Sequence, residues 1–220
     1  MATFVVRVWM PDRPGVLGAV ASRVGAVRGD VVGIDILERG AGRAIDELVV
    51  DLPDADLVPL LIAEISQVDG VDVEDVRPAL SVPDARLAAL EAAALIVEAQ
   101  TTDALLTALV EHLRGDFEGD WAAVIGLDAG APLASAGDAP DIAWLTAFVD
   151  GSRSSDVLAA GEGGPDDLAW SSLPAGGLSL VVGRHGRPFR ARERRQLAAL
   201  ARIADRRWVE LASQVPVPRP

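Results

Sequence analysis

Asp12-Arg13-Pro14-Gly15-Val16-Leu17 separates a strand-like pattern from a helix-like pattern, and this junction decides the fold of the first part of the chain. Before it, apolar residues alternate along residues 3–10, which is the period of a β-strand. After it, apolar residues recur at spacings of three and four along residues 14–28, which indicates a helix with one buried stripe. We therefore expect a strand, a tight turn and a helix in direct succession.

The segments that follow complete a βαββαβ order. Strand patterns cover residues 31–37 and 44–52, with the hairpin-type connection Gly40-Ala41-Gly42 between them. A second helix is expected over residues 55–68, with Asp54 or Asp56 at its N-terminus, and a last strand over residues 71–76. This order predicts a ferredoxin-like module over residues 1–79, in which both helices cover one face of a single sheet.

A second domain is expected over residues 80–213. Helices are predicted at 84–100, 102–113, 142–149 and 191–211, with Thr102 or Asp103 as the cap of the second. Strands are predicted at 121–127, 133–136, 168–173 and 178–182, and a glycine-rich loose segment at 157–165. Residues 214–220 are expected to form a flexible tail. The overall fold class is α+β.

Composition excludes several classes of function. The chain has no cysteine and, by inspection, no lysine, which excludes disulfides, thiolate metal sites, Schiff bases and the P-loop. A net charge of −13 argues against a nucleic-acid partner. No long uncharged apolar run and no signal segment occur, so we expect a soluble, cytoplasmic protein without membrane contact.

Residues that could carry catalysis or hold a metal are sparse. His112 and His185 lack the spacing of a metal site, and no serine lies in a G-x-S-x-G motif. Ser152, Ser154 and Ser155 are better explained as a turn of small residues. The acidic pairs Asp46-Glu47, Glu74-Asp75 and Asp166-Asp167 are better explained as solvated carboxylates. We expect no enzyme activity, no metal and no cofactor.

Charge is unevenly distributed in the second half. Residues 116–170 are strongly acidic and residues 184–210 strongly basic, so we expect these regions to face each other within the fold or across a dimer. The sharper alternative is an anion site near Arg184, Arg187, Arg190 and Arg194. Trp9 and Val5 share the sheet face away from the helices, which a partner subunit or the second domain is expected to cover.

The junction motif D-x-P-G-x-L, placed between strand and helix inside βαββαβ, resembles the ACT domain family. That resemblance implies a regulatory module that binds an amino acid or related effector at an interface between ACT domains. The family's ligand residues correspond to Asp12, Pro14, Gly15, Val16 and Leu17 in the turn, and to Gly33, Ile34, Asp35 and Ile36 in the second strand. The alternative is that Asp12 and Pro14 only cap and start a helix.

The chemistry of the turn agrees with this role. Gly15 lets a ligand approach the backbone, and the N–H groups of Val16, Leu17 and Gly18 open a helix whose positive end attracts a carboxylate. Asp12 can receive an ammonium group. We therefore expect the ligand to bind at this turn.

The second half more loosely resembles a GAF domain, with flanking helices at its start and end, the strand in Gly119-Asp120-Trp121-Ala122-Ala123-Val124-Ile125 and the segment Gly183-Arg184-His185-Gly186-Arg187-Pro188-Phe189. That resemblance implies a bundle of its first and last helices that joins two subunits. Together the two resemblances predict a non-catalytic homodimer, or higher homo-oligomer, that senses a small effector and acts on a regulated protein partner. The alternative is a protein-docking or dimerisation adaptor that has lost ligand binding.

Overall fold

The computed structural model describes residues 1–79, 85–126, 131–153 and 165–214. The chain forms two compact units, Met1–Asp84 and Ala85–Pro220, which are described in turn. The expected flexible tail at 214–220 and the expected loose segment at 157–165 lie almost wholly outside the described residues, as do Ser154 and Ser155.

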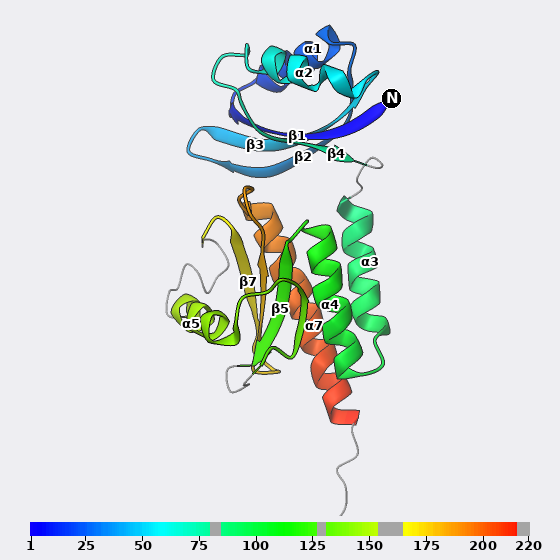
Figure 1. Cartoon of the computed structure of the whole chain (residues 1–220), viewed down its shortest axis with the longest axis vertical. Coiled ribbons are helices and arrows are strands. Elements are labelled where there is room, and N and C mark those ends of the chain that lie inside the picture. The colour runs from blue at the N-terminus through cyan, green and yellow to red at the C-terminus, as the bar shows by residue number, and fades with distance from the viewer. Residues whose placement is uncertain (80–84, 127–130, 154–164, 215–220) are drawn as a thin grey trace, which may run out of the picture. The chain divides into compact units, whose positions relative to one another are not determined.

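The first unit has the βαββαβ order. Its elements are β1 (Ala2–Pro11), α1 (Val16–Ala26), β2 (Asp30–Gly40), β3 (Arg43–Leu52), the 3-10 turn η1 (Ala55–Leu57), α2 (Val58–Ile65) and β4 (Asp72–Ala79). The strands form one antiparallel sheet in the order β2-β3-β1-β4. Helices α1 and α2 pack against each other on one face of this sheet (Figure 1).

The core of the first unit lies between the sheet and its helices. Alternate residues of β1 and β3 face it, while α1 contributes Val16, Val20 and Val24, and α2 contributes Leu61 and Ile65. The β2–β3 turn uses Ala41 and Gly42, both with positive φ, as a two-residue hairpin requires. The second helix differs from its prediction: residues 55–57 are a 3-10 turn capped by Asp54, whose side chain accepts a bond from the N–H of Asp56.

The second unit is a sheet between two helical layers. Its elements are α3 (Ala85–Glu98), α4 (Thr102–Asp116), β5 (Trp121–Gly126), β6 (Ala134–Gly137), α5 (Ile142–Arg153), β7 (Leu168–Leu173), β8 (Leu178–Gly183) and α7 (Ala191–Gln214). The strands are antiparallel in the order β6-β5-β8-β7. Helices α3, α4 and α7 cover one face and α5 covers the other (Figure 1).

Helix α4 shows why the larger layer is stable. Leu105, Leu109 and Leu113 are spaced by four residues and are almost fully buried. Complete burial of such a side chain contributes about 1.5–3 kcal/mol. The N-cap is Thr101, which accepts a hydrogen bond from the N–H of Ala104, so the expected cap at Thr102 or Asp103 was wrong by one or two residues.

Candidate functional site

The turn between β1 and α1 is the best-defined site of the first unit. Gly15 is the N-cap of α1 and has a φ of 92°, a conformation that residues with a Cβ rarely adopt. The N–H of Asp12 donates to the carbonyl of Gly42 at 2.9 Å, which fastens the turn to the β2–β3 hairpin. Within the described residues no side chain caps α1, so the alternative role of Asp12 as a helix cap was wrong.

The first turn of α1 presents unsatisfied donors. In the described part of the chain, no acceptor bonds the N–H groups of Val16, Leu17 or Gly18. A Cβ placed on Gly15 or Gly18 would meet no atom within 4 Å, so the space above these groups is open. Free N–H groups at the positive end of a helix dipole form a binding site for an anion such as a carboxylate.

The turn also carries an acidic side chain, that of Asp12, which interacts with Arg39 and Asp46. The Asp12 carboxylate is 41% exposed, and its Oδ1 lies 3.9 Å from Nε of Arg39, too far for a hydrogen bond. Burial raises the pKa of Asp46; the charge of Arg39 lowers it and that of Asp12 raises it, and the net result is a pKa above the usual value for aspartate. The two carboxylates and Arg39 therefore act on one another.

Asp46 is a candidate residue that sequence reasoning missed. It had been interpreted as half of a solvated acidic pair with Glu47, but it is 3% exposed and its Oδ1 has no hydrogen-bond donor among the described residues. In β3 it shares the helix side of the sheet with Ala44 and Leu48. A carboxylate at an apolar position of an alternating strand was the available signal.

The expected second-strand residues of the site fall on two sides of the sheet. Ile34 is opposite Leu48 and Ile36 is opposite Asp46, so both isoleucines face the helix side, where they are 49% and 43% exposed. Gly33 and Asp35 belong to the opposite side. The structure thus places Ile34 and Ile36, but not Asp35, on the face that carries the turn.

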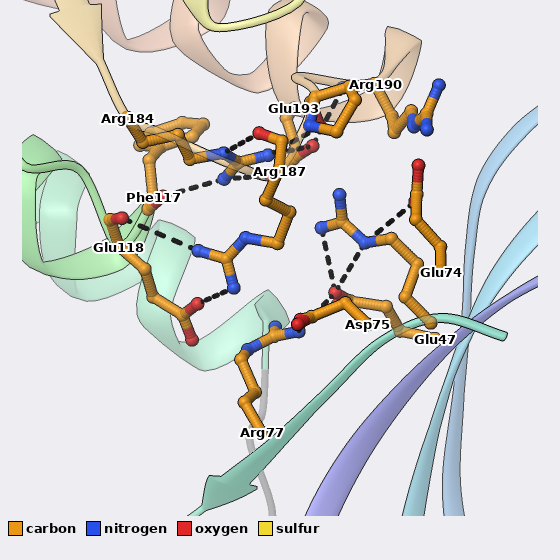
Figure 2. A network of polar contacts seen from close by, with 12 residues as sticks. Glu47, Glu74, Asp75, Arg77, Phe117, Glu118, Arg184, Arg187, Arg190 and Glu193 are labelled. Atoms are coloured by element: carbon orange, nitrogen blue, oxygen red, sulfur yellow. Dashed lines mark hydrogen bonds and ion pairs between the residues drawn. The ribbon is translucent and has the colours of Figure 1, made fainter. Parts of the chain in front are cut away.

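The helix-free side of the sheet carries an ion-pair network, shown in Figure 2. Arg7, which is 1% exposed, donates to Glu47 at 2.8 Å, and Arg77 approaches the same oxygen at 2.9 Å and Asp75 at 3.3 Å. Burial alone would raise the pKa of Glu47, but the two arginines hold it below its usual value. The pairs Asp46-Glu47 and Glu74-Asp75 are therefore not simply solvated, as had been expected.

In the second unit, the Arg184 side chain binds backbone carbonyl groups and one carboxylate (Figure 2). It donates to the carbonyls of Phe117, Arg187 and Pro188 at 2.7–2.8 Å and pairs with Glu193 at 2.7 Å. Arg194 likewise donates to the carbonyls of Leu168 and Pro165, both at 2.8 Å. These donors of Arg184 and Arg194 are therefore occupied by carbonyl groups, whereas an anion site near Arg187 and Arg190 stays a prediction.

Two pairs of side chains join the acidic region of residues 116–170 to the basic region of residues 184–210, as had been expected. Arg187 forms an ion pair with Glu118, and Nδ1 of His185 lies 2.7 Å from the Asp120 carboxylate. The bond from His185 lowers the pKa of Asp120. These contacts join the start of the acidic region to the segment before α7.

A cavity of about 800 Å³ opens at the end of the second sheet that carries Asp120 and His185. Its lining includes Asp120, Trp121, Asp138, Trp144, Asp167 and His185. His185 is exposed, and Ser152, which had been expected in a small-residue turn, lies buried in α5. Among the described residues, no group of three or more potential ligands could hold a metal ion, and no helix could cross a membrane.

Comparison with known proteins assigns the first unit. Residues 4–70 match the ACT domain family. ACT domains are generally regulatory, ligand-binding modules, and the first unit is therefore called the ACT module below. The GAF likeness of the second unit stays a prediction.

Several solved structures are similar to the chain at low sequence identity. The ACT domain from GTP pyrophosphokinase of Chlorobium tepidum is 15% identical, with a TM-score of 0.29, and the match covers 36% of this chain and 100% of that chain. A formyltetrahydrofolate deformylase from Pseudomonas putida is 17% identical, with a TM-score of 0.31, and the match covers 40% of this chain and 36% of the deformylase.

A longer match is to a protein of unknown function from Galdieria sulphuraria, which is 16% identical, with a TM-score of 0.33 and coverage of 82% of this chain and 78% of that chain. No curated protein resembles the chain closely enough to count as a match. Similarity at this level says nothing about ligand or activity.

Proposed function

We propose that this protein is a non-catalytic regulator whose ACT module binds an amino acid, or a similar small effector, at the turn formed by residues 12–17. The observation that carries the proposal is the first turn of α1, where the N–H groups of Val16, Leu17 and Gly18 have no acceptor within the described residues. The exposed carboxylate of Asp12 belongs to the same turn.

An α-amino acid carries an acceptor and a donor that complement the free N–H groups and the carboxylate of this turn. Its carboxylate would accept hydrogen bonds from the helix N-terminus, and its ammonium group would pair with Asp12. The left-handed conformation of Gly15 leaves the approach to those N–H groups open. A simple anion would satisfy the donors but would be repelled by the carboxylate beside them.

We further propose that two ACT modules join through β2. This strand lies at the edge of the sheet, and it exposes the apolar side chains of Val32, Ile34 and Ile36. Exposed apolar edge strands are templates for pairing with another chain. A second module would cover these side chains and enclose the ligand between the two copies.

Regulation then follows from linkage. A ligand that binds one arrangement of the dimer more tightly shifts the population toward that arrangement. The second unit would carry the change to a regulated protein partner. The proposal requires no catalytic residue, metal or cofactor.

The test is a thermal-shift screen of the full chain against the twenty amino acids, followed by calorimetric titration of those that shift the melting temperature. Gly15→Val should abolish binding. Gly177→Val is the matched control, because Gly177 has a φ of 65° and a Cβ there also meets no atom within 4 Å, but it lies in the second unit. Equal binding by wild type and Gly15→Val would disprove the site.

A second candidate function is supported by α3. This helix exposes Leu87, Leu90, Leu95 and Val97, with exposed fractions from 46% to 69%. Large apolar side chains on one exposed helix indicate a docking surface for a protein. If no amino acid binds and Leu90→Glu removes self-association or partner binding, the adaptor function replaces the sensor function.

A further inference from the structure

We infer that the ACT module selects an amino acid with a positively charged side chain, and that Asp46 is the residue that selects it. This inference rests on the proposed amino-acid site and goes one step further, from the common part of the ligand to its side chain. It depends on the position of Asp46, its missing donor and the charge around it.

The position of Asp46 places it on the ligand side of the sheet. In the register of the strands, Asp46 lies between Val8 of β1 and Ile36 of β2. Val8 is part of the core beneath the helices, so Asp46 faces the same side. The turn that starts α1 follows directly from the end of β1 on that side.

The missing donor is unusual for a buried carboxylate. Asp46 is 3% exposed, and its Oδ1 has no hydrogen-bond partner among the described residues. Buried polar atoms nearly always have a partner, because an unsatisfied one costs free energy. A ligand that brings an N–H donor to this oxygen removes that cost, and a ligand without one does not.

The side-chain charges favour a cation. Asp12 and Asp46 provide two carboxylates against one guanidinium, that of Arg39, which leaves a net charge of −1. Arg39 is 58% exposed and 3.9 Å from Asp12, so it makes no short bond to Asp12 and can move aside. A zwitterion with an additional positive charge balances this set, whereas an acidic amino acid would increase the excess.

The surface beside Asp46 suits a long aliphatic stem. Ile36 is directly opposite Asp46 on β2, and Ile34 precedes it on the same side. Both are more than 40% exposed. The methylene groups of an arginine or lysine ligand can lie along these isoleucines while the charged end reaches the carboxylate, as such side chains do on protein surfaces.

The test compares matched pairs of ligands on the full-length protein by calorimetric titration. Citrulline has the shape of arginine without its charge, and norleucine lacks the amino group of lysine. Wild type should bind arginine or lysine at least about tenfold more tightly than the neutral partner, as expected for a charged hydrogen bond. Asp46→Asn should reduce that preference to about twofold or less and leave the affinity for the neutral ligands unchanged.

Asp72→Asn on β4, the opposite edge strand, is the control and should keep the wild-type preference. Equal affinity of wild type for charged and neutral ligands overturns the inference but leaves the amino-acid site standing. A preference that persists in Asp46→Asn also overturns it. Binding of no amino acid at all defeats the proposed function itself. The wild-type comparison needs no variant, so the inference can fail even if Asp46→Asn does not fold.

Discussion

The substitutions Gly15→Ala and Gly18→Ala, at the start of α1, should change the stability of the ACT module in opposite directions. Gly15 and Gly18 both have open space where a Cβ would stand, so neither substitution introduces a clash. They differ in backbone conformation, because Gly15 has a φ of 92° whereas Gly18 lies within α1. The sign of each effect therefore depends on the backbone alone.

The magnitudes follow from that difference. Alanine at Gly15 must adopt a left-handed conformation, which costs about 1–2 kcal/mol. Alanine at Gly18 improves helix propensity and should stabilise by about 0.5–1 kcal/mol. The two variants should therefore differ by about 2 kcal/mol, which corresponds to roughly 8–16 °C in melting temperature for a unit of this size.

Hydrogen exchange of the amides in β1 and β3, read by mass spectrometry at increasing urea concentration, isolates the ACT module from the second unit. Wild type, Gly15→Ala and Gly18→Ala are measured side by side without ligand. If both variants shift the free energy of unfolding in the same direction, the conformation of this turn and the reasoning from it are wrong.

Other predictions concern the charged groups and a helix cap. Arg184→Met should lower the free energy of unfolding of the second unit by about 3–5 kcal/mol in chemical denaturation, and Glu193→Leu in the same chain should recover part of the loss, since it removes the carboxylate that has lost the Arg184 guanidinium. The pKa of Glu47 is lowered in the folded chain, so its contribution to stability is present above the ordinary value of 4.5 and is lost as the pH falls through the folded pKa. Urea midpoints at pH 7 and at about pH 3.5 should therefore differ less for Glu47→Gln than for wild type. Thr101→Ala should cost about 1 kcal/mol, and Thr102→Ala, which leaves the cap intact, less than about 0.5 kcal/mol; equal losses would contradict the assigned cap.

Periodicity was sufficient to predict the elements of the ACT module. The alternation in residues 3–10 and the three-and-four spacing after Pro14 correspond to β1 and α1, with differences of one or two residues at the ends. A hairpin-type connection at Gly40-Ala41-Gly42 was also expected, and the structure forms its turn from Ala41 and Gly42. These features depend on local sequence, which is why one sequence was enough to predict them.

The side assignment of β2 could not be read from alternation. The register shifts between Val31 and Gly33 and again between Ile36 and Glu38. Each bulge adds one residue to one strand and reverses the sides on which later residues lie. The expected site covered the whole stretch from Gly33 to Ile36, so it included Asp35, which belongs to the side opposite Ile34 and Ile36.

Burial of charge was the other feature that the sequence concealed. Asp46 and Arg184 are charged residues in segments that read as surface or turn, yet both are 3% exposed. Their environments are formed by segments distant in sequence: Arg184 reaches the carbonyl of Phe117, 67 positions away. Local propensity carries no information about partners at such separations.

The order of strands in the second unit has a consequence for synthesis of the chain on the ribosome. Strand β5 pairs on one side with β8, and α3 and α4 pack on α7, so the core of this unit closes only when its last helix is available. The ACT module needs nothing beyond β4 to complete its own sheet. Domains generally fold as units, N-terminal first, while translation continues. The ACT module can therefore fold before α7, the helix that covers α3 and α4, has been synthesised.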